Sequence, residues 1–464
     1  MRLDALFRPR SIAVIGASEK PTIGRRLIVS LDRIGFTGQV FPINPSYPTV
    51  LGRTCYPTIA DTPETPDVAV FCLGHRLILD AFIAAAERGI RGAVIYDGGF
   101  AERGEDGRRL QDRIAAICRE RNIALCGPNC MGILNPAERN STYLQEIRDP
   151  EGLAGNVGIV SQSGGLCVSL LTDVSRFGFS HIASCGNEAV LEATDFLEHL
   201  IEDPHTAVIG CFIETVRSPE RFAAALDHAA ARDKPVVALK VGRTARARYA
   251  VATHTAGEAG DSAVFSDMLC AHRAIEVNDL AEFTEVLAAC QGKRCPTGRR
   301  LGIITSSGGL AELILDLAEE HGFEVPPLAP DVKTELDSLA GYITGDGNPL
   351  DAWGNGTFVP NLDHSLAALQ ASPDHDAIVF LRDNGAAQPM DQPETALNYL
   401  RQFARAAAAS DKPHYLLHTR AGQMDPAHVA CLREAGIPIV AGLREGLGAI
   451  DKLARWGDWK RNSV

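Results

Sequence analysis

The residue with the clearest potential for chemistry is His254, which stands between Thr253 and Thr255 in a segment otherwise rich in Ala and Gly. We expect this segment, residues 249–260, to form a loop that leaves the imidazole ring uncovered. A neutral imidazole nitrogen is nucleophilic near pH 7 and can accept a phosphoryl group. A lone histidine is more often structural or solvent-exposed, so the spacing alone leaves that alternative open.

A second candidate is a compact group of hydroxyl residues and glycines: Ser161, Gln162, Ser163, Gly164 and Gly165. It follows an expected strand at residues 157–160 and precedes an expected helix at residues 166–176. Hydroxyls and glycines at a helix N-terminus can bind a phosphate closely, because they supply short donors and admit the ligand to the backbone. The alternative is a capped helix without a ligand, since Ser is a common N-cap.

Glu214 follows an apolar strand expected at residues 207–213. Ligands of doubly wound sheets bind at the carboxyl ends of parallel strands, which is where this carboxylate would lie. Glu214 would there be able to orient a histidine by accepting a hydrogen bond from its second ring nitrogen. A solvated glutamate at a strand end is the alternative.

The N-terminal region contains a turn of small residues between an expected strand at 11–15 and an expected helix at 23–34: Gly16, Ala17, Ser18, Glu19 and Lys20. Such a turn directs backbone N–H groups and a helix dipole at an anion, which fits a nucleotide phosphate. A nicotinamide dinucleotide is disfavoured, because GxGxxG is absent and the second strand ends in Asn44-Pro45 instead of an acidic residue. A tight turn without a ligand is the alternative.

These residues need a scaffold of parallel sheets. In the first region, short apolar strands are expected at residues 40–43, 68–73, 92–96 and 124–126, and helices at residues 77–88 and 108–121. Continuous apolar strands that alternate with helices predict an α/β fold whose parallel sheets are covered on both faces. A polar segment, residues 136–156, is interpreted as a linker, and a short break follows at residues 291–299. We expect three domains, at residues 1–140, 150–292 and 298–464.

The second and third domains carry an internal repeat. Gly158-Ile-Val-Ser-Gln-Ser-Gly-Gly-Leu166 aligns with Gly302-Ile-Ile-Thr-Ser-Ser-Gly-Gly-Leu310. The same register, without a gap, aligns Gly178-Phe179 with Gly322-Phe323. Both copies are therefore expected to open with one strand, one turn and one helix of a flavodoxin-like domain.

The overall composition excludes several classes of protein. A net charge of −13 without a basic stripe argues against nucleic-acid binding. The 12 cysteines show no metal-binding spacing, so no metal site is expected and the thiols are predicted to be reduced, as in the cytoplasm. No run of roughly 18 apolar residues is present, so no membrane span is expected. The N-terminus lacks the long apolar core of a signal peptide.

Taken together, the motifs resemble those of the NDP-forming acyl-CoA synthetases, relatives of succinyl-CoA synthetase. The resemblance extends over essentially the whole chain. Its motifs, in order, are Ser11-Ile-Ala-Val-Ile-Gly-Ala-Ser18, Val40-Phe-Pro-Ile-Asn-Pro45, Gly127-Pro-Asn-Cys-Met-Gly132, Gly158-Ile-Val-Ser-Gln-Ser-Gly-Gly165, Gly186-Asn-Glu188 and Asn348-Pro-Leu-Asp351. The resemblance implies a Rossmann-like CoA-binding domain followed by two flavodoxin-like, succinyl-CoA synthetase-like domains.

The resemblance also implies roles for individual residues. His254 would be the phosphorylated residue and Glu214 its carboxylate partner, with Ser161, Ser163, Gly164 and Gly165 as the phosphate cradle. The residues that would bind coenzyme A are Gly16, Ala17, Ser18 and Lys20 at its phosphates, Asn44 and Pro45 along the nucleotide, Cys72 and Gly98 beside the pantetheine arm, and Asn129. In such an enzyme a small carboxylic acid, a nucleoside triphosphate and CoA give acyl-CoA, NDP and phosphate, reversibly.

Two departures from the family pattern bear on this expectation. The residues after His254 are Thr-Ala-Gly-Glu-Ala-Gly, where the family has Thr-Gly-Ala-Leu-Ala-Gly, so Glu258 introduces a charge. No ATP-grasp segment follows the third domain. The resemblance therefore implies an α subunit in a hetero-oligomer with an ATP-grasp β subunit, which would bind ATP or GTP with Mg²⁺. A regulatory protein that binds CoA or acyl-CoA without catalysis is the alternative. No motif encodes the acyl substrate, the choice between ADP and GDP, or the physiological direction.

Overall fold

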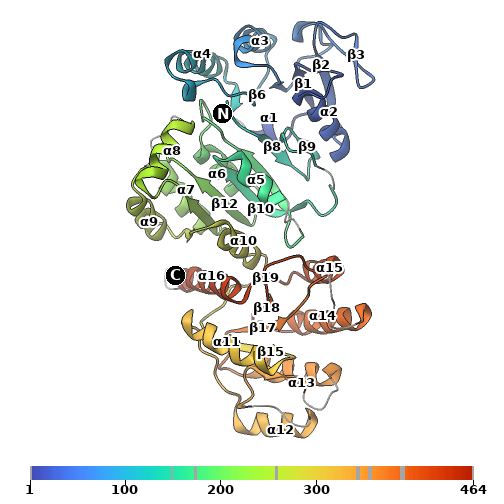
Figure 1. Cartoon of the computed structure of the whole chain (residues 1–464), viewed down its shortest axis with the longest axis vertical. Coiled ribbons are helices and arrows are strands. Elements are labelled where there is room, and N and C mark those ends of the chain that lie inside the picture. The colour runs from blue at the N-terminus through green and yellow to red at the C-terminus, as the bar shows by residue number, and fades with distance from the viewer. Residues whose placement is uncertain are drawn as a thin grey trace. The chain divides into compact units, whose positions relative to one another are not determined.

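The computed structural model describes residues 3–147, 150–171, 175–255, 260–340, 345–353, 358–386 and 392–461. The chain divides into two compact units, of which the first comprises Met1–Val174 and Gly178–Glu276 and the second comprises Ser175–Phe177 and Val277–Val464. Three larger sheets, flanked by helices, make up the described fold (Figure 1). The predicted α/β class is confirmed, whereas the boundaries of the three domains stay a prediction.

The first sheet has five parallel strands in the order β2-β1-β5-β6-β7. Their bounds are β1 Ser11–Ile15, β2 Gln39–Ile43, β5 Val68–Phe71, β6 Gly92–Ile95 and β7 Ala124–Cys126. Every residue of β1 and β5 is buried, as expected for strands covered on both faces. The chain order reverses between β1 and β5, which makes their carboxyl ends the switch point where such sheets bind ligands.

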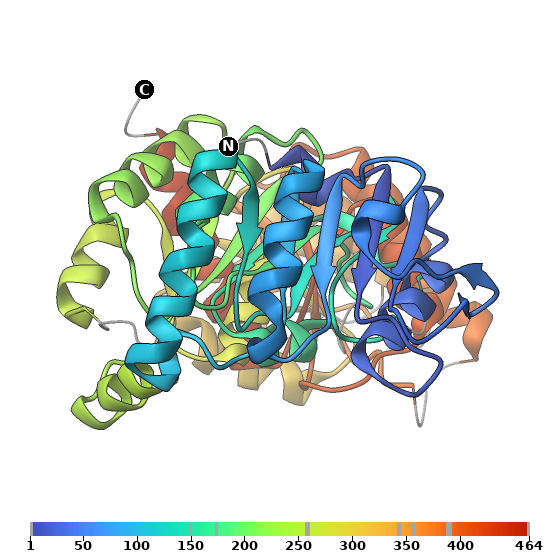
Figure 2. The same cartoon turned by 90° about the horizontal axis from the view of Figure 1, so that it is seen from above.

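Helices cover both faces of this sheet because the crossovers on the two sides of β1 run in opposite directions. Their bounds are α1 Asp4–Phe7, α2 Ile23–Ile34, α3 His75–Arg88 and α4 Glu105–Arg121, with short turns η1 Ile59–Asp61 and η2 Ala101–Arg103 and a hairpin of β3 Thr49–Val50 and β4 Arg53–Thr54. Helix α2 buries Leu27, Ile28, Leu31 and Ile34 at helical spacing and ends at Gly35, whose φ is +76°. Figure 2 shows α3 and α4 side by side.

The second sheet has seven strands in the order β14-β13-β12-β10-β11-β8-β9. Their bounds are β8 Gly132–Asn135, β9 Asn140–Ser141, β10 Ala154–Ser161, β11 Phe179–Ser184, β12 Val208–Ile213, β13 Val236–Lys240 and β14 Ile275–Val277. Strand β8 pairs antiparallel with β11 and then with β9. The prediction of a plain linker at residues 136–156 is therefore wrong at both ends, because β9 and the start of β10 belong to the sheet.

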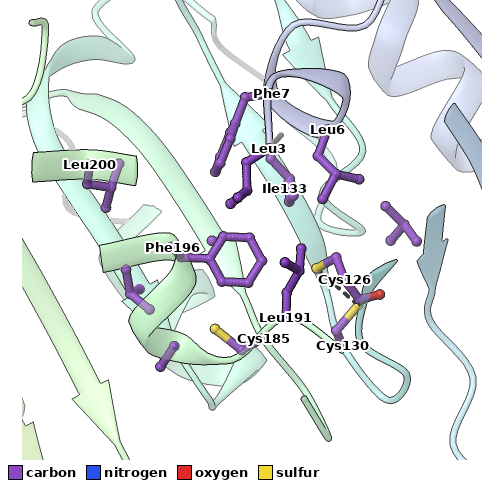
Figure 3. Close-up of a cluster of buried hydrophobic side chains, with 14 of the residues drawn as sticks. Leu3, Leu6, Phe7, Cys126, Cys130, Ile133, Cys185, Leu191, Phe196 and Leu200 are labelled. Carbon is purple, nitrogen blue, oxygen red and sulfur yellow. Dashed lines mark hydrogen bonds between the residues drawn. The ribbon is translucent and has the colours of Figure 1, made fainter. Parts of the chain in front are cut away.

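The helices that accompany the second sheet are α5 Gly164–Leu171, α6 Ala193–Glu202, α7 Pro219–Ala231, α8 Ala245–Thr255 and α9 Ser262–Ala271. A hydrophobic cluster joins the first two sheets within the first unit (Figure 3). In it Phe7 from α1 is fully buried and packs edge-on against Phe196 of α6, with ring centroids 6.2 Å apart. Ile133 of β8 and Cys126 of β7 belong to the same cluster. The two sheets of this unit therefore share one core.

The third sheet is parallel, in the order β16-β15-β17-β18-β19. The strands are β15 Leu301–Thr305, β16 Leu350–Asp351, β17 Ala377–Arg382, β18 His414–His418 and β19 Ile439–Ala441; the helices of the second unit are α10 Leu280–Ala289, α11 Gly308–Glu320, α12 Pro330–Ala340, α13 Phe358–Ala371, α14 Pro393–Ala408, α15 Pro426–Ala435 and α16 Leu443–Arg461. The predicted common opening of the two repeats is confirmed, since β10 leads into α5 as β15 leads into α11. No helix within the described ranges is long and apolar enough to cross a bilayer.

Candidate functional site

The turn after β1 is closed by its own backbone. The N–H groups of Gly16 and Ala17 both donate to the carbonyl of Ile43, at 3.0 and 3.3 Å. Gly16 has a φ of +92°, and a Cβ atom there would lie 2.6 Å from the carbonyl oxygen of Cys72. Two of the predicted phosphate donors are thus engaged inside the turn, and Gly16 acts by leaving space where two strand ends approach each other.

A largely apolar cavity of about 300 Å³ opens beside this turn. It is lined by Gly16, Asn44 and Pro45 among the predicted CoA-binding residues, and by Ile43, Ile59 and Leu73. Asn44 is fixed by donating from Nδ2 to the carbonyl of Ala17 at 2.6 Å. The cavity lies at the switch point of the first sheet, where a flat apolar group such as a nucleotide base would be buried.

Ser18 and Lys20 lie on the outer part of the same turn. The Ser18 hydroxyl is buried and accepts the N–H of Lys20 at 3.0 Å, whereas Lys20 itself is exposed. Ser18 thus shapes the turn, and Lys20 offers a mobile positive charge at its rim.

Gly98 and Asn129 lie together at the ends of β6 and β7. A Cβ atom on Gly98 would come within 3.5 Å of Asn129 Oδ1 and 3.1 Å of Glu102 Oε1. Asn129 adopts a φ of +56°. Cys72, after β5, is half-buried, and burial raises the pKa of its thiol to about 12, so this sulfur is a poor nucleophile at neutral pH.

Two turns that are far apart in sequence interlock beside Asn129. The N–H of Asn187 donates to the carbonyl of Pro128 at 2.8 Å, and Asn129 Nδ2 donates to Asn187 Oδ1 at 3.2 Å. Asn187 Nδ2 in turn donates to Glu102 Oε2 at 2.5 Å. Burial alone would raise the pKa of Glu102, but hydrogen bonds from Asn187 and from nearby backbone N–H groups outweigh it and lower that pKa. The ends of β6, β7 and β11 are thereby held as one rigid corner.

The Ser161–Gly165 segment forms the turn into α5, and its members differ in role. Ser161 is fully buried; its hydroxyl donates to the carbonyl of Ser163 at 2.7 Å and accepts the N–H of Ser163 at 3.1 Å. A Cβ atom on Gly164 would collide with the side chain of Met131, while a Cβ atom on Gly165 would meet no atom within 4 Å. Ser161 and Gly164 therefore build the turn, whereas Ser163 and Gly165 form its accessible side.

Gln162 ties this turn to the neighbouring strand ends. Its Oε1 accepts the N–H groups of Glu214 and Thr215 at 2.6 and 2.9 Å, and its Nε2 donates to Glu188 Oε1 at 2.8 Å. Glu188, with a φ of +54°, also accepts from Arg217 Nε at 2.8 Å. Burial raises the pKa of Glu188, although its hydrogen bonds and the Arg217 charge oppose the shift.

Glu214 lies just beyond β12 and is 6% exposed. Lys240, the last residue of β13, donates from Nζ to the Glu214 carbonyl at 2.7 Å. Burial lowers the pKa of Lys240, and the Glu214 carboxylate opposes that shift. A buried carboxylate and a buried ammonium group are thus held at adjacent strand ends.

His254 is the next-to-last residue of α8, the helix that follows β13. The expectation of a loop at this position is wrong for the backbone, which remains helical through Thr255. The His254 side chain, and the predicted variant residues Ala256 to Glu258, lie outside what the structure describes. Helix α8 lies next to η2, the turn that contains Glu102. The helix bearing the predicted phosphohistidine therefore reaches the corner built by Gly98, Asn129 and Asn187.

Sequence reasoning did not assign roles to Gln162, Asn187, Glu188, Arg217 or Lys240. Asn187 and Glu188 lie within the motif Gly186-Asn-Glu188, and Gln162 lies within the segment Ser161–Gly165. Their position in these motifs was the signal that could have pointed to a role in the site. The hydrogen bonds from Gln162 to Glu188, from Glu214 to Gln162 and from Asn187 to Glu102 join residues that lie 26, 52 and 85 positions apart in the chain. No group of three or more His, Cys, Asp or Glu within the described residues is arranged to hold a metal ion.

Comparisons with known proteins define the class of protein. Residues 10–136 match the model of a CoA binding domain, and residues 154–290 match that of a succinyl-CoA ligase like flavodoxin domain. The cavity after β1 thus lies in the CoA-binding part, and Gln162, Glu188, Glu214 and His254 lie in the ligase-like part.

Individual relatives narrow the class further. The chain is 30% identical over 353 residues to the α subunit of the ADP-forming acetate–CoA ligase II of Pyrococcus furiosus, which covers 75% of this chain and 76% of that protein. It is 35% identical over 370 residues to a trans-feruloyl-CoA synthase from an unidentified prokaryote, covering 78% of this chain but only 52% of that protein. This chain therefore spans about half the length of that relative.

A solved structure agrees along the whole chain. It is the "dinucleotide forming Acetyl-coenzyme A synthetase 1" of Ca. Korarchaeum cryptofilum in complex with phosphate and ADP, with a TM-score of 0.84 and 26% identity. The match covers 100% of this chain and 99% of that one. The chain belongs to the NDP-forming acyl-CoA synthetase family. Of the relatives named above, the Pyrococcus furiosus protein is an ADP-forming acyl-CoA ligase subunit by name.

Proposed function

We propose that the chain is the α subunit of an NDP-forming acyl-CoA synthetase that carries a transient phosphoryl group on His254. The observation that carries this proposal is the convergence of three elements at one edge of the second sheet. The α5 turn follows β10, Glu214 follows β12, and α8 with His254 follows β13; β10 pairs with β12, and β12 with β13. A phosphate would meet a helix N-terminus there, close to a buried carboxylate.

The reaction runs in steps that this chain shares with a partner. ATP or GTP, bound with Mg²⁺ on a separate ATP-grasp β subunit, phosphorylates an imidazole nitrogen of His254. The phosphoryl group then passes to a small carboxylic acid, and the CoA thiolate displaces phosphate from the acyl phosphate. Glu214 orients the imidazole and Gly165 with Ser163 receives the phosphoryl oxygens. Each step is reversible, so the same site would make a nucleoside triphosphate from a thioester.

CoA fits the cavity of the first sheet. Its nucleotide would lie against Asn44 and Pro45 beside Gly16, with Ala17, Ser18 and Lys20 nearest its phosphates and Cys72, Gly98 and Asn129 along the pantetheine arm. The support is that Gly16, Asn44 and Pro45 line this cavity and that it lies within the residues that match a CoA binding domain. The 12 free cysteines suit a reducing compartment, so we place the protein in the cytoplasm.

The proposals of a partner subunit and of a carboxylic acid substrate are supported by the names of the relatives. The Pyrococcus protein is an α subunit by name, which supports a hetero-oligomer with a separate second chain. One relative is named for acetate and another for trans-ferulate. A panel of carboxylic acids that includes small aliphatic and aryl acids is therefore the appropriate substrate screen.

A labelling experiment tests the proposal. The chain is incubated with an ATP-grasp subunit, Mg²⁺ and ATP labelled in the γ-phosphate, and the protein is then assayed for acid-labile, base-stable phosphate. We expect label on the wild type and on His228→Ala, a variant of an exposed histidine in α7, and none on His254→Ala. CoA should still bind to His254→Ala. Label that persists in His254→Ala refutes the phosphohistidine role.

The alternative is a CoA-binding regulatory protein without catalysis, which the charge at Glu258 favours. The same experiment separates the two. If an ATP-grasp subunit that is active with another α subunit leaves this chain unlabelled, while CoA binds, the regulatory function replaces the enzymatic one.

A further inference from the structure

His75 and Asp97 form a side-chain pair at the carboxyl edge of the first sheet that has no role in the mechanism above. His75 is the first residue of α3, and Asp97 lies two residues beyond β6. Asp97 Oδ2 accepts the backbone N–H of His75 at 2.6 Å and lies 3.3 Å from His75 Nδ1. The two side chains are 43% and 39% exposed, so the pair is open to a ligand.

The neighbouring turn is shaped around the imidazole ring. Gly99 has a φ of +103°, and a Cβ atom there would lie 2.5 Å from His75 Nδ1. Only glycine therefore leaves the space that the ring occupies. When Nδ1–H donates to the Asp97 carboxylate, the other nitrogen, Nε2, keeps its lone pair and can accept a proton.

The position of the pair along the sheet edge indicates what it would meet. The strand order places the cavity at the ends of β2 and β1, His75 after β5 and Asp97 after β6. Beyond β6 comes η2, against which α8 lies. A CoA molecule whose nucleotide fills the cavity and whose thiol points toward α8 must pass the ends of β5 and β6. His75 stands on that path, between Cys72 and the Gly98 turn.

We propose that His75 is the general base that deprotonates the CoA thiol, with Asp97 as the residue that orients it. This inference rests on the proposed function. His75 Nε2 takes the proton of the S–H group, and the thiolate attacks the carbonyl carbon of the acyl phosphate. The C–S bond forms as the C–O bond to phosphate breaks, the electron pair leaves with phosphate, and the imidazolium proton passes to the released phosphate or to water. No redox partner is required.

The chemistry explains why a base is useful here. An alkyl thiol is mostly protonated near neutral pH, and the thiolate is the nucleophile. A positioned imidazole contributes typically 10²–10⁴-fold in such a proton transfer. Asp97 contacts the imidazole ring. The segments around α3 carry further charged residues, among them Glu102 after β6, Asp61 in η1, Arg76 and Asp80 on α3 itself, and Glu105 and Asp106 at the start of α4.

The test separates acyl phosphate formation from thioester formation. The chain with its ATP-grasp partner, ATP, Mg²⁺ and acid is assayed with hydroxylamine in place of CoA, which traps acyl phosphate as hydroxamate. The same mixture is then assayed with CoA for thioester. We expect His75→Gln to form hydroxamate at the wild-type rate. Its kcat for thioester formation should fall by about 10²–10⁴-fold at pH 7, with the KM for CoA changed less than about threefold.

The pH profile distinguishes a base from a structural residue. The deficit of His75→Gln should shrink toward pH 9, because the thiol then ionises without assistance. Asp97→Asn, which keeps an acceptor for the His75 N–H, should show a smaller loss of kcat with the same trend. His228→Gln serves as the control histidine and should match the wild type throughout.

Three outcomes are decisive. A wild-type kcat for thioester formation in His75→Gln overturns the general-base role. A loss of kcat that stays constant from pH 7 to pH 9, or a rise in KM alone, overturns it too and assigns the pair to CoA binding or to the start of α3. Absence of hydroxamate from the wild type overturns the proposed function itself, and with it the role of His75.

Discussion

Gln162 Nε2 donates to Glu188 Oε1 at 2.8 Å, and this bond joins the turn after β10 to the turn after β11. The other end of the same amide accepts the backbone N–H of Glu214 at 2.6 Å. One side chain thus sets the spacing of three strand ends in the second sheet. Gln162 is 6% exposed and Glu188 is 7% exposed. If either side chain were removed, water could not take its place as the hydrogen-bond partner of the other without rearrangement of the surrounding residues.

Removal of the Glu188 carboxylate should therefore destabilise the fold. Glu188→Ala leaves donors from Gln162 and Arg217 without their acceptor, and we expect a loss of about 2–4 kcal/mol in the free energy of unfolding. Glu188→Gln keeps the shape and one acceptor, so its loss should be smaller. Urea unfolding measures both, with Glu202→Ala, an exposed glutamate of α6, as a control expected below about 1 kcal/mol. Equal stabilities for the three variants would contradict this account.

The two adjacent glycines of the α5 turn should respond differently to the same substitution. Gly164→Ala forces a Cβ atom against Met131, so it should lower thermal stability. Gly165→Ala meets no protein atom and should leave stability within about 0.5 kcal/mol of the wild type. It should still slow labelling of His254, because the methyl group would occupy the proposed phosphate position. Normal labelling of a folded Gly165→Ala protein would remove this turn from the phosphate site.

Gly16→Ala should weaken CoA binding. The new Cβ atom would lie 2.6 Å from the Cys72 carbonyl, at a φ of +92° that alanine adopts only with strain. We expect a loss of about 1–3 kcal/mol in stability and a raised Kd for CoA by calorimetry. Gly52→Ala is the matched control, since its φ is +74° but no atom lies within 4 Å of the added methyl group. A Gly16→Ala protein that binds CoA normally would exclude this turn from the site.

Acid should destabilise the first unit through His181. This residue is 2% exposed, and burial lowers its pKa to about 4, although the nearby Asp203 carboxylate opposes the shift and His199, Arg8 and His205 reinforce it. Between the ordinary histidine pKa and about 4, the unfolded chain binds a proton that the native protein does not bind. Stability must therefore fall as pH falls through this range, by on the order of 3 kcal/mol.

Urea midpoints measured at pH 7.5, 6 and 5 check this sign. His181→Gln should lower the midpoint at pH 7.5 but flatten its dependence on pH. If the urea midpoint of the wild type rises on acidification, groups other than His181 determine how stability depends on pH.

Local sequence signals were sufficient to predict many of the strands and helices. The predicted strand Ser11–Ile15 and helix Ile23–Ile34 agree with the structure residue for residue, because their apolar periodicity and the terminating Gly35 are local features. Strand β9 was missed because it is two residues long in a polar segment and is stabilised by pairing with β8. The helical end of α8 was missed because alanines and threonines around His254 are compatible with a loop or a helix.

The candidate site could likewise be predicted only in part from the sequence. The glycines, serines and Glu214 could be selected because each residue type suits a phosphate or a histidine. Their different roles could not be predicted, since Gly164 and Gly165 are distinguished by contacts with distant residues such as Met131. The Gln162–Glu188 bond and the His75–Asp97 pair each join positions more than 20 residues apart, which no local pattern encodes.

Strands β8 and β9 have a mechanical consequence for catalysis. They follow β7 directly in the chain, yet β8 hydrogen-bonds to β11, so the chain passes from the edge of the CoA-binding sheet into the ligase-like sheet, and the two sheets share a core. A hinge between these two sheets would have to open that shared core. In the proposed mechanism, any distance between a nucleotide on the partner subunit and the acyl group would therefore be bridged by a short segment such as the end of α8, while these two sheets keep their arrangement.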